Sequence, residues 1–116
     1  MGWKIIYFKT ETGKFPVYVF IESLTSLAQA KVIHSLDLLE EFGILLGLPH
    51  VKKISGTDLW ELRVLGKDNI RIFYIAMTGK SFLLLHGFVK KKQKADIKEI
   101  KTAEKRLQEY RNRNTN

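Results

Sequence analysis

Apolar and polar residues alternate along four stretches of the chain, and this alternation predicts four β-strands. In the first stretch, residues 3–9, aromatic and aliphatic side chains alternate with lysines. The other three, residues 59–65, 70–76 and 82–89, follow one another closely and are separated by the turn-forming sequences GKDN and MTGKS. Short turns of this kind join neighbouring antiparallel strands, so these three strands are predicted to form a meander.

Two stretches before the meander and one after it have apolar residues three or four positions apart, the spacing that is typical of amphipathic helices. The Val, Tyr and Phe content of FPVYVFIESLTS favours a strand, but Pro16 suits the first turn of a helix, and we expect a short helix that ends near Leu24. Ser26 is expected to cap a second helix that continues to about Phe42, where Gly43 ends it. The apolar stripe of the third helix consists of Ile100, Ala103, Leu107 and Tyr110.

The predicted elements follow the order β-α-α-β-β-β-α, which indicates the α+β fold class. We expect a single domain over residues 1–116, because the chain is too short for two domains of ordinary size and contains no linker or internal repeat. In this domain the N-terminal helical hairpin and the C-terminal helix are expected to pack on one side of an antiparallel sheet.

The apolar positions also fix the register between two neighbouring strands. When the apolar faces of residues 59–65 and 70–76 are matched, Arg63 lies directly opposite Arg71, and Glu61 lies two residues along on the same face. Opposed like charges destabilise a strand pair by some tenths of a kcal/mol, and one carboxylate cannot bind two guanidiniums in bidentate geometry. Two interpretations stay open: a site for a phosphate, or an exposed sheet face with an ordinary ion pair.

Charge is distributed unevenly along the chain, whose formal net charge is +8. Residues 90–116 contain ten Lys or Arg against four Asp or Glu and therefore carry most of this excess. Such a segment attracts polyanions such as nucleic acid, an acidic protein surface or an anionic membrane. Charge alone is more typical of a solvated basic helix, on which Lys98, Lys101, Lys105 and Arg106 would lie in solvent.

The sequence does not contain the residues that several common kinds of functional site require. The chain has no cysteine, and its three histidines do not have the paired spacing of a metal site, so we expect neither a metal nor a cofactor. No phosphate-binding glycine motif or nucleophile elbow is present. The sequence contains neither a signal peptide nor an apolar run long enough for a membrane helix, which predicts a soluble, cytoplasmic protein.

The stretches LPHVKKISGTDLWELRV, NIRIFYI and LLLHGFVKKKQK, with the helix that follows, resemble the HigB branch of the RelE/ParE toxin superfamily, in its phage-derived-like subgroup. The resemblance covers nearly the whole chain and implies a RelE-like fold. It also implies the toxin component of a type II toxin–antitoxin system. Many RelE and HigB members cleave mRNA in the ribosomal A site, whereas ParE members inhibit DNA gyrase.

Carried over residue by residue, the resemblance implies a metal-independent endoribonuclease without cofactors. Glu61 matches the general base of some members, Arg71 matches the arginine that binds the scissile phosphate, and Arg63 matches a position that is often basic. The general acid is left between His86, in the LHGF motif, and a lysine. The implied catalytic residues are Glu61, Arg63, Arg71, His86, Lys90 and Lys91. The expected RNA-binding residues are Lys52, Lys53, Lys92, Lys94, Lys101 and Lys105.

The implied partners are a helix-turn-helix antitoxin of the HigA-like kind, the ribosome and mRNA, with no membrane. Two other functions stay open on the sequence. One is inhibition of gyrase in the manner of ParE, and the other is a non-catalytic RNA- or DNA-binding module, for which the basic C-terminal segment would also serve. The residues Glu61, Arg63 and Arg71, together with the lysine cluster, favour the nuclease.

Overall fold

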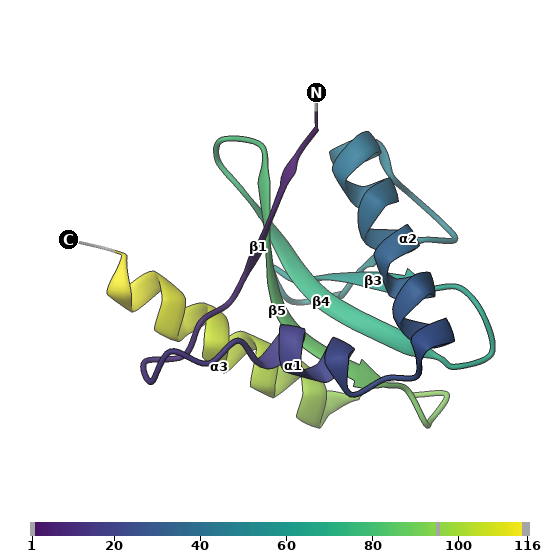
Figure 1. Ribbon diagram of the computed structural model, residues 1–116. Helices are drawn as coiled ribbons and strands as arrows, with labels where there is room; N and C mark the ends of the chain where they lie inside the picture. Colours follow the sequence, from purple (N-terminus) through teal and green to yellow (C-terminus); the bar gives the residue numbers. More distant parts are fainter. Residues whose placement is uncertain (1, 95, 115–116) are drawn as a thin grey trace.

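The computed structural model describes residues 2–94 and 96–114, which form an α+β fold as predicted. One sheet with the strand order β1-β5-β4-β3-β2 lies at its centre (Figure 1). The strands are β1 (Lys4–Tyr7), β2 (Val51–Lys53), β3 (Trp60–Val64), β4 (Ile70–Met77) and β5 (Ser81–Val89). The helices are α1 (Pro16–Glu22), α2 (Ser26–Phe42), the short 3-10 helix η1 (Gly43–Leu45) and α3 (Ile97–Arg113).

The register predicted between β3 and β4 is confirmed. Val64 pairs with Ile70, and Arg63 pairs with Arg71 directly across the two strands. Strands β2 to β5 form a continuous antiparallel meander, with one irregularity in the β4–β5 pairing at Phe73. Matching of the apolar faces therefore determined the alignment of these strands, because a slip by one residue would turn every buried side chain toward the opposite face.

Two features of the sheet differ from the prediction. The first strand, β1, pairs with β5 in parallel, so the sheet is mixed rather than antiparallel throughout. Alternation of apolar and polar residues identifies a segment as a strand, but it does not tell whether the neighbouring strand runs parallel or antiparallel to it. The sheet also contains β2, which was not predicted as a separate strand, since its three residues are too few to show an alternating pattern.

The helices cover both faces of the sheet, and the prediction that they pack on one side is wrong. α1 and α2 enclose a core that includes Ile72 and Tyr74 of β4. α3 encloses a second core on the opposite face, which includes Phe73 and Ile75 of the same strand. Because residues 72–77 of β4 are all apolar, one layer of helices would have left apolar side chains of the other face exposed to water.

The helix boundaries agree with the prediction except at one cap. Thr25 rather than Ser26 caps α2, because the Thr25 hydroxyl accepts a hydrogen bond from the Ala28 amide at 3.2 Å. α2 ends at Gly43, whose φ of 57° favours glycine and whose missing Cβ leaves room for the ring of Trp3. In the described part of the chain, no helix combines the length and the apolar character needed to cross a membrane.

Candidate functional site

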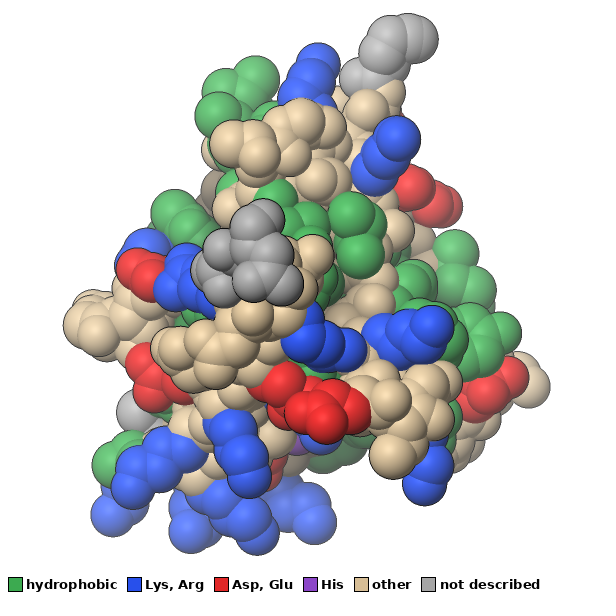
Figure 2. Space-filling view, turned by 90° about the vertical axis from the view of Figure 1, so that its left-hand side faces the viewer, with side chains coloured by type: hydrophobic (Ala, Val, Ile, Leu, Met, Phe, Trp, Pro, Cys, Tyr) green, Lys and Arg blue, Asp and Glu red, His purple; other side chains and the backbone are tan. Residues whose placement is uncertain are grey.

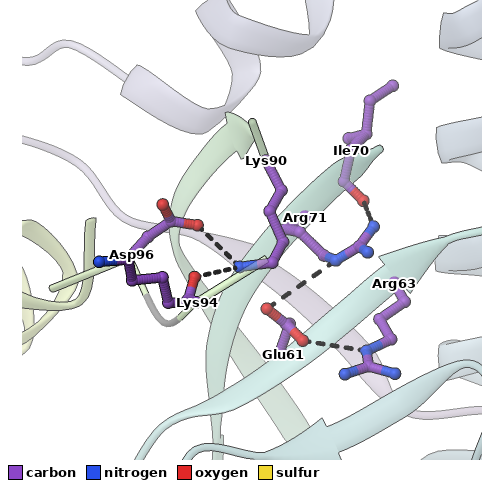
Figure 3. A network of polar contacts seen from close by, with 7 residues as sticks. All are labelled: Glu61, Arg63, Ile70, Arg71, Lys90, Lys94 and Asp96. Carbon is purple, nitrogen blue, oxygen red and sulfur yellow. Dashed lines mark hydrogen bonds and ion pairs between the residues drawn. The ribbon is translucent and has the colours of Figure 1, made fainter. Parts of the chain in front are cut away.

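A buried carboxylate lies between two arginines on the face of the sheet that α3 partly covers. Glu61 of β3 is 6% exposed, and its Oε1 accepts a hydrogen bond from Arg63 Nε at 3.0 Å. Its Oε2 lies 3.9 Å from Arg71 Nε, on the neighbouring strand β4 (Figure 3). The three side chains that the register predicted on one face therefore form one charged cluster, in which a single carboxylate faces two guanidiniums.

Arg71 is held in place without using all its hydrogen-bond donors. Its Nη1 donates to the carbonyl of Ile70 at 3.2 Å. Its Nε is buried and has no hydrogen-bond acceptor within the described residues, since Glu61 is too distant for a hydrogen bond. A buried donor without an acceptor is uncommon in folded proteins and costs about 1–3 kcal/mol. The guanidinium of Arg71 is thus incompletely compensated by the protein itself.

Glu61 and Arg63 of the cluster border an open cleft of about 300 Å³, which Arg71 does not line. Four bases line the cleft, namely Lys52 and Lys53 of β2, Arg63 of β3 and Lys90 after β5. The acids that line it are Glu61 and Asp96, and Phe73 and Ile100 provide apolar surface. The ammonium of Lys53 lies over Trp60 on the other face, but the three remaining bases still outnumber the two acids, so the cleft attracts anions. Five of the residues that the sequence predicted, Lys52, Lys53, Glu61, Arg63 and Lys90, are brought together here.

Lys90 is positioned by contacts at both ends of the residue. Its ammonium forms an ion pair with Asp96 at 3.0 Å and donates to the carbonyl of Lys94 at 2.9 Å (Figure 3). Its backbone amide donates to the carbonyl of Asn69 in the β3–β4 turn at 2.8 Å. These contacts fix the start of the β5–α3 loop beside the cleft.

Asp96 was not predicted as a site residue. It occupies the N-cap position of α3, but its side chain makes no capping hydrogen bond and contacts Lys90 instead. A capping aspartate usually contributes about 1 kcal/mol to helix stability. An aspartate that directly precedes an amphipathic helix and follows a run of lysines was the signal available in the sequence.

His86 does not belong to the cleft. Its Nε2 lies 2.6 Å from Oε1 of Glu99, and its Nδ1 lies 3.1 Å from Nη1 of Arg106, so two residues of α3 hold the ring. Arginine can only donate, so Nδ1 accepts and Nε2 carries the proton of a neutral imidazole. Burial lowers the pKa of His86, an effect that the hydrogen bond to Glu99 opposes and the charge of Arg106 reinforces.

Phe73 separates His86 from the charged cluster. In the register of the sheet Phe73 is the partner of Glu61 on one side and of His86 on the other. Two strand spacings, or roughly 10 Å, therefore lie between Glu61 and His86. The two side chains share a face but cannot contact one leaving group directly.

The remaining basic residues lie outside the cleft. Lys91, Lys92 and Lys94 are exposed and border a second hollow together with Lys98. Lys101 and Lys105 lie exposed along α3, as predicted. Lys and Arg side chains gather along the bottom of the molecule in Figure 2, toward which the N-terminal end of α3 points in Figure 1.

Arg106 differs from its basic neighbours on α3. It was expected in solvent but is partly buried, and its Nη1 donates to the carbonyl of Leu85 at 2.9 Å. A helical wheel could not reveal this contact, because the long side chain reaches back to the sheet from the edge of the apolar stripe. Across residues 2–94 and 96–114, no three His, Asp or Glu side chains are grouped to hold a metal ion.

Comparison with known proteins assigns the family. The model of the phage-derived Gp49-like proteins (DUF891) matches residues 19–108, a range that includes the whole charged cluster, the cleft and most of α3. No curated protein shows significant similarity to the chain. Toxins of toxin–antitoxin systems in the RelE superfamily make up this family, and an antitoxin is thereby implied as a partner. The chain belongs to the phage-derived Gp49-like family of RelE/HigB-like toxins.

Proposed function

We propose that the protein is the toxin of a type II toxin–antitoxin system, and that it cleaves mRNA on the ribosome without a metal ion. The observation that carries this proposal is the carboxylate of Glu61 between the guanidiniums of Arg63 and Arg71, at the edge of a basic cleft. Cleavage of RNA by its own 2′-hydroxyl needs a base, cations beside the phosphate and an acid, all close together.

In the proposed reaction Glu61 takes the proton of the ribose 2′-hydroxyl, and the 2′-oxygen attacks the adjacent phosphorus. Arg63 and Arg71 stabilise the charge that develops on the non-bridging oxygens. The bond to the 5′-oxygen then breaks and leaves a 2′,3′-cyclic phosphate. The opposed arginines, which repel each other in the free protein, gain a second shared anion when a phosphate enters, and this favours binding of the substrate.

Lys90 is the proposed proton donor to the leaving 5′-oxygen. It lines the same cleft as Glu61, and Asp96 positions its ammonium there. His86 is the poorer candidate of the two, because Glu99 and Arg106 already engage both its ring nitrogens and because burial favours its neutral form. Lys91 then acts in binding rather than in chemistry, since it is exposed outside the cleft.

The exposed lysines of the β5–α3 loop and of α3 are proposed to bind ribosomal RNA. Lys92, Lys94, Lys101 and Lys105 can each neutralise a backbone phosphate, and such contacts add affinity without sequence preference. The antitoxin that opposes this activity is proposed to be a helix-turn-helix protein, as for HigB-like toxins.

Mapping of RNA ends after induction of the protein tests this function. We expect new 5′-hydroxyl ends in mRNA, in frame with codons, within minutes of induction. Glu61→Gln keeps the shape of the side chain but removes the base, so cleavage should fall by roughly 10²–10⁴-fold. Glu104→Gln, an exposed carboxylate of α3, is the matched control and should cleave normally.

Two results would overturn the proposal. If growth stops without new mRNA ends and plasmid DNA loses supercoiling, the protein is a gyrase inhibitor. If Glu61→Gln cleaves mRNA as fast as the unchanged protein, Glu61 is not the base and the site has been assigned wrongly.

A further inference from the structure

The sheet ends at β2, and in the described part of the chain no strand pairs with the outer edge of β2. The amide of Arg63 donates to the carbonyl of His50 at 2.7 Å, and that of Ile54 donates to the carbonyl of Leu59 at 3.0 Å. Backbone groups in an antiparallel pair alternate in direction, so Val51 and Lys53 direct theirs away from β3. The Val51 amide already bonds the carbonyl of Gly47, which leaves the Val51 carbonyl and the backbone of Lys53 for a further strand.

One face of the sheet beside this edge is largely apolar, although the ammonium of Lys53 lies over the Trp60 ring there, 5.9 Å from its centroid. A small pocket of about 70 Å³ is lined there only by apolar residues and Gly43, and these include Val51, Trp60 and Tyr74. Large hydrophobic side chains are exposed in the segment that borders it. Ile44 is 71% exposed and Leu45 is 86% exposed, and Leu48 farther along the loop is 72% exposed.

The opposite face beside the same edge is basic. Lys52 pairs with Glu61 across β2 and β3, so its side chain points to the cleft face of the sheet. Lys52 and Arg63 line the cleft together. A strand added to β2 would therefore place its side chains alternately beside apolar surface and beside cations.

We propose that the open edge of β2 binds an extended segment of the antitoxin in which apolar and acidic residues alternate. The acidic residues lie opposite Lys52 on the cleft face, and the apolar residues cover the pocket on the other face, next to the Lys53 ammonium that lies over Trp60. The segment blocks the cleft at Lys52 while its main chain pairs with Lys53. This inference rests on the toxin function proposed above, but it requires no particular chemistry in the cleft.

The proposal distinguishes strand addition from simple attraction of acids to a basic protein. Short edge strands with lysines also serve to prevent aggregation, and that role alone would leave β2 without a ligand. A surface that only attracts acids would take any acidic chain, and it would do so equally through Lys101 and Lys105. Strand addition instead requires the backbone N–H of Lys53.

Chemical shift mapping on the ¹⁵N-labelled full chain tests the proposal. The probe is an end-capped eight-residue peptide of alternating valine and glutamate, with the alternating valine and lysine peptide as control. We expect the first peptide to shift the amide signals of residues 51–53 and of Trp60, and to slow hydrogen exchange at Lys53. The control peptide should leave these signals unchanged.

Two variants at one position separate backbone pairing from side-chain charge. Lys53→Ala removes the ammonium and keeps the N–H, whereas Lys53→Pro also removes the N–H that points away from β3. We expect Lys53→Pro to bind the valine–glutamate peptide at least about tenfold more weakly than Lys53→Ala. The remaining amide spectrum of Lys53→Pro should show the native fold.

Several outcomes would overturn the proposal. One is equal affinity of the two variants for the valine–glutamate peptide. Another is a shift of the amide signals only at Lys101 and Lys105. A third is the absence of any shift at residues 51–53 when the peptide is present at millimolar concentration. Signals at residues 51–53 that move with protein concentration alone would assign the edge to a second copy of the chain. None of these measurements involves RNA, so a failure here is distinguishable from a failure of the proposed nuclease.

Discussion

Arg63 lies directly opposite Arg71 on neighbouring strands, an arrangement of like charges that a stable sheet ordinarily avoids. Glu61 contacts both guanidiniums but forms a hydrogen bond only with Arg63. The charge of Arg71 is therefore only partly balanced by the surrounding residues, and its buried Nε has no hydrogen-bond acceptor within the described residues. A bound phosphate at this cluster, as proposed above, would supply the missing compensation.

Arg71→Ala should abolish growth arrest while leaving the fold intact. The substitution removes one of two opposed charges and a buried donor without an acceptor, so we expect the free energy of unfolding to change by less than about 1 kcal/mol. The measurements are growth after induction at matched expression and the midpoint of urea unfolding. A variant that still arrests growth would show that Arg71 does not bind the phosphate.

Lys90→Met should reduce single-turnover cleavage by roughly 10²–10⁴-fold, because it removes the proposed proton donor but keeps the aliphatic stem. Lys91→Met is the matched control: it removes the same charge from the adjacent position, which lies outside the cleft. It should weaken ribosome binding slightly and leave the rate of bound enzyme unchanged. Equal losses in the two variants would indicate that Lys90 acts only through its charge.

His86 should make the protein less stable in acid. Burial lowers its pKa in the folded state, so below about pH 6.5 the unfolded chain binds a proton that the folded protein resists. Acidification from about pH 7 therefore lowers the free energy of unfolding until the folded pKa is reached. His86→Gln should lose less stability over the same range. Parallel curves of urea midpoint against pH for the two proteins would contradict this.

Reversal of the charges at Lys101 and Lys105 to glutamate should weaken ribosome association, most clearly at low salt. Fewer phosphates are neutralised, so the salt dependence of binding should decrease by about one unit of slope per contact. Both side chains are exposed, and the free energy of unfolding should change by less than about 0.5 kcal/mol. Co-sedimentation with ribosomes at two salt concentrations measures the effect.

Reversal at Lys14 and Lys67 is the matched control, since these exposed lysines lie outside α3 and the change in net charge is the same. It should weaken association less than the reversal on α3. If all proteins sediment alike at both salt concentrations, the basic face of α3 is only a solvated surface.

The charged cluster could be predicted from the sequence because it depends on alternation within two neighbouring strands. Matching of the buried faces of β3 and β4 left only one position for Arg63 relative to Arg71, and the structure has that register. The Lys90–Asp96 contact could not be predicted by matching alternating strands. It depends on the path of a loop, and loop paths are determined by contacts between residues that show no periodic pattern.

The orientation of His86 shows where alternation fails. Leu85 packs in the core beneath α3, and strict alternation would turn His86 to the opposite face. A register shift at Phe73 inserts one extra residue of β5, so His86 also faces α3, where it contacts Glu99. Such a bulge has no signature in this sequence, and the partners of His86 were therefore missed.

The parallel pairing of β1 with β5 has a consequence for the order of folding. Lys4 pairs with Ser81, so about two-thirds of the chain separates the two strands, and no short turn can bring them together. The antiparallel meander needs only local contacts and should form first. Arg113 of α3 then donates to the carbonyl of Lys9 at 2.6 Å, just after β1. The first strand to be synthesised can therefore join the sheet only after β5, the last strand in the sequence, has been made.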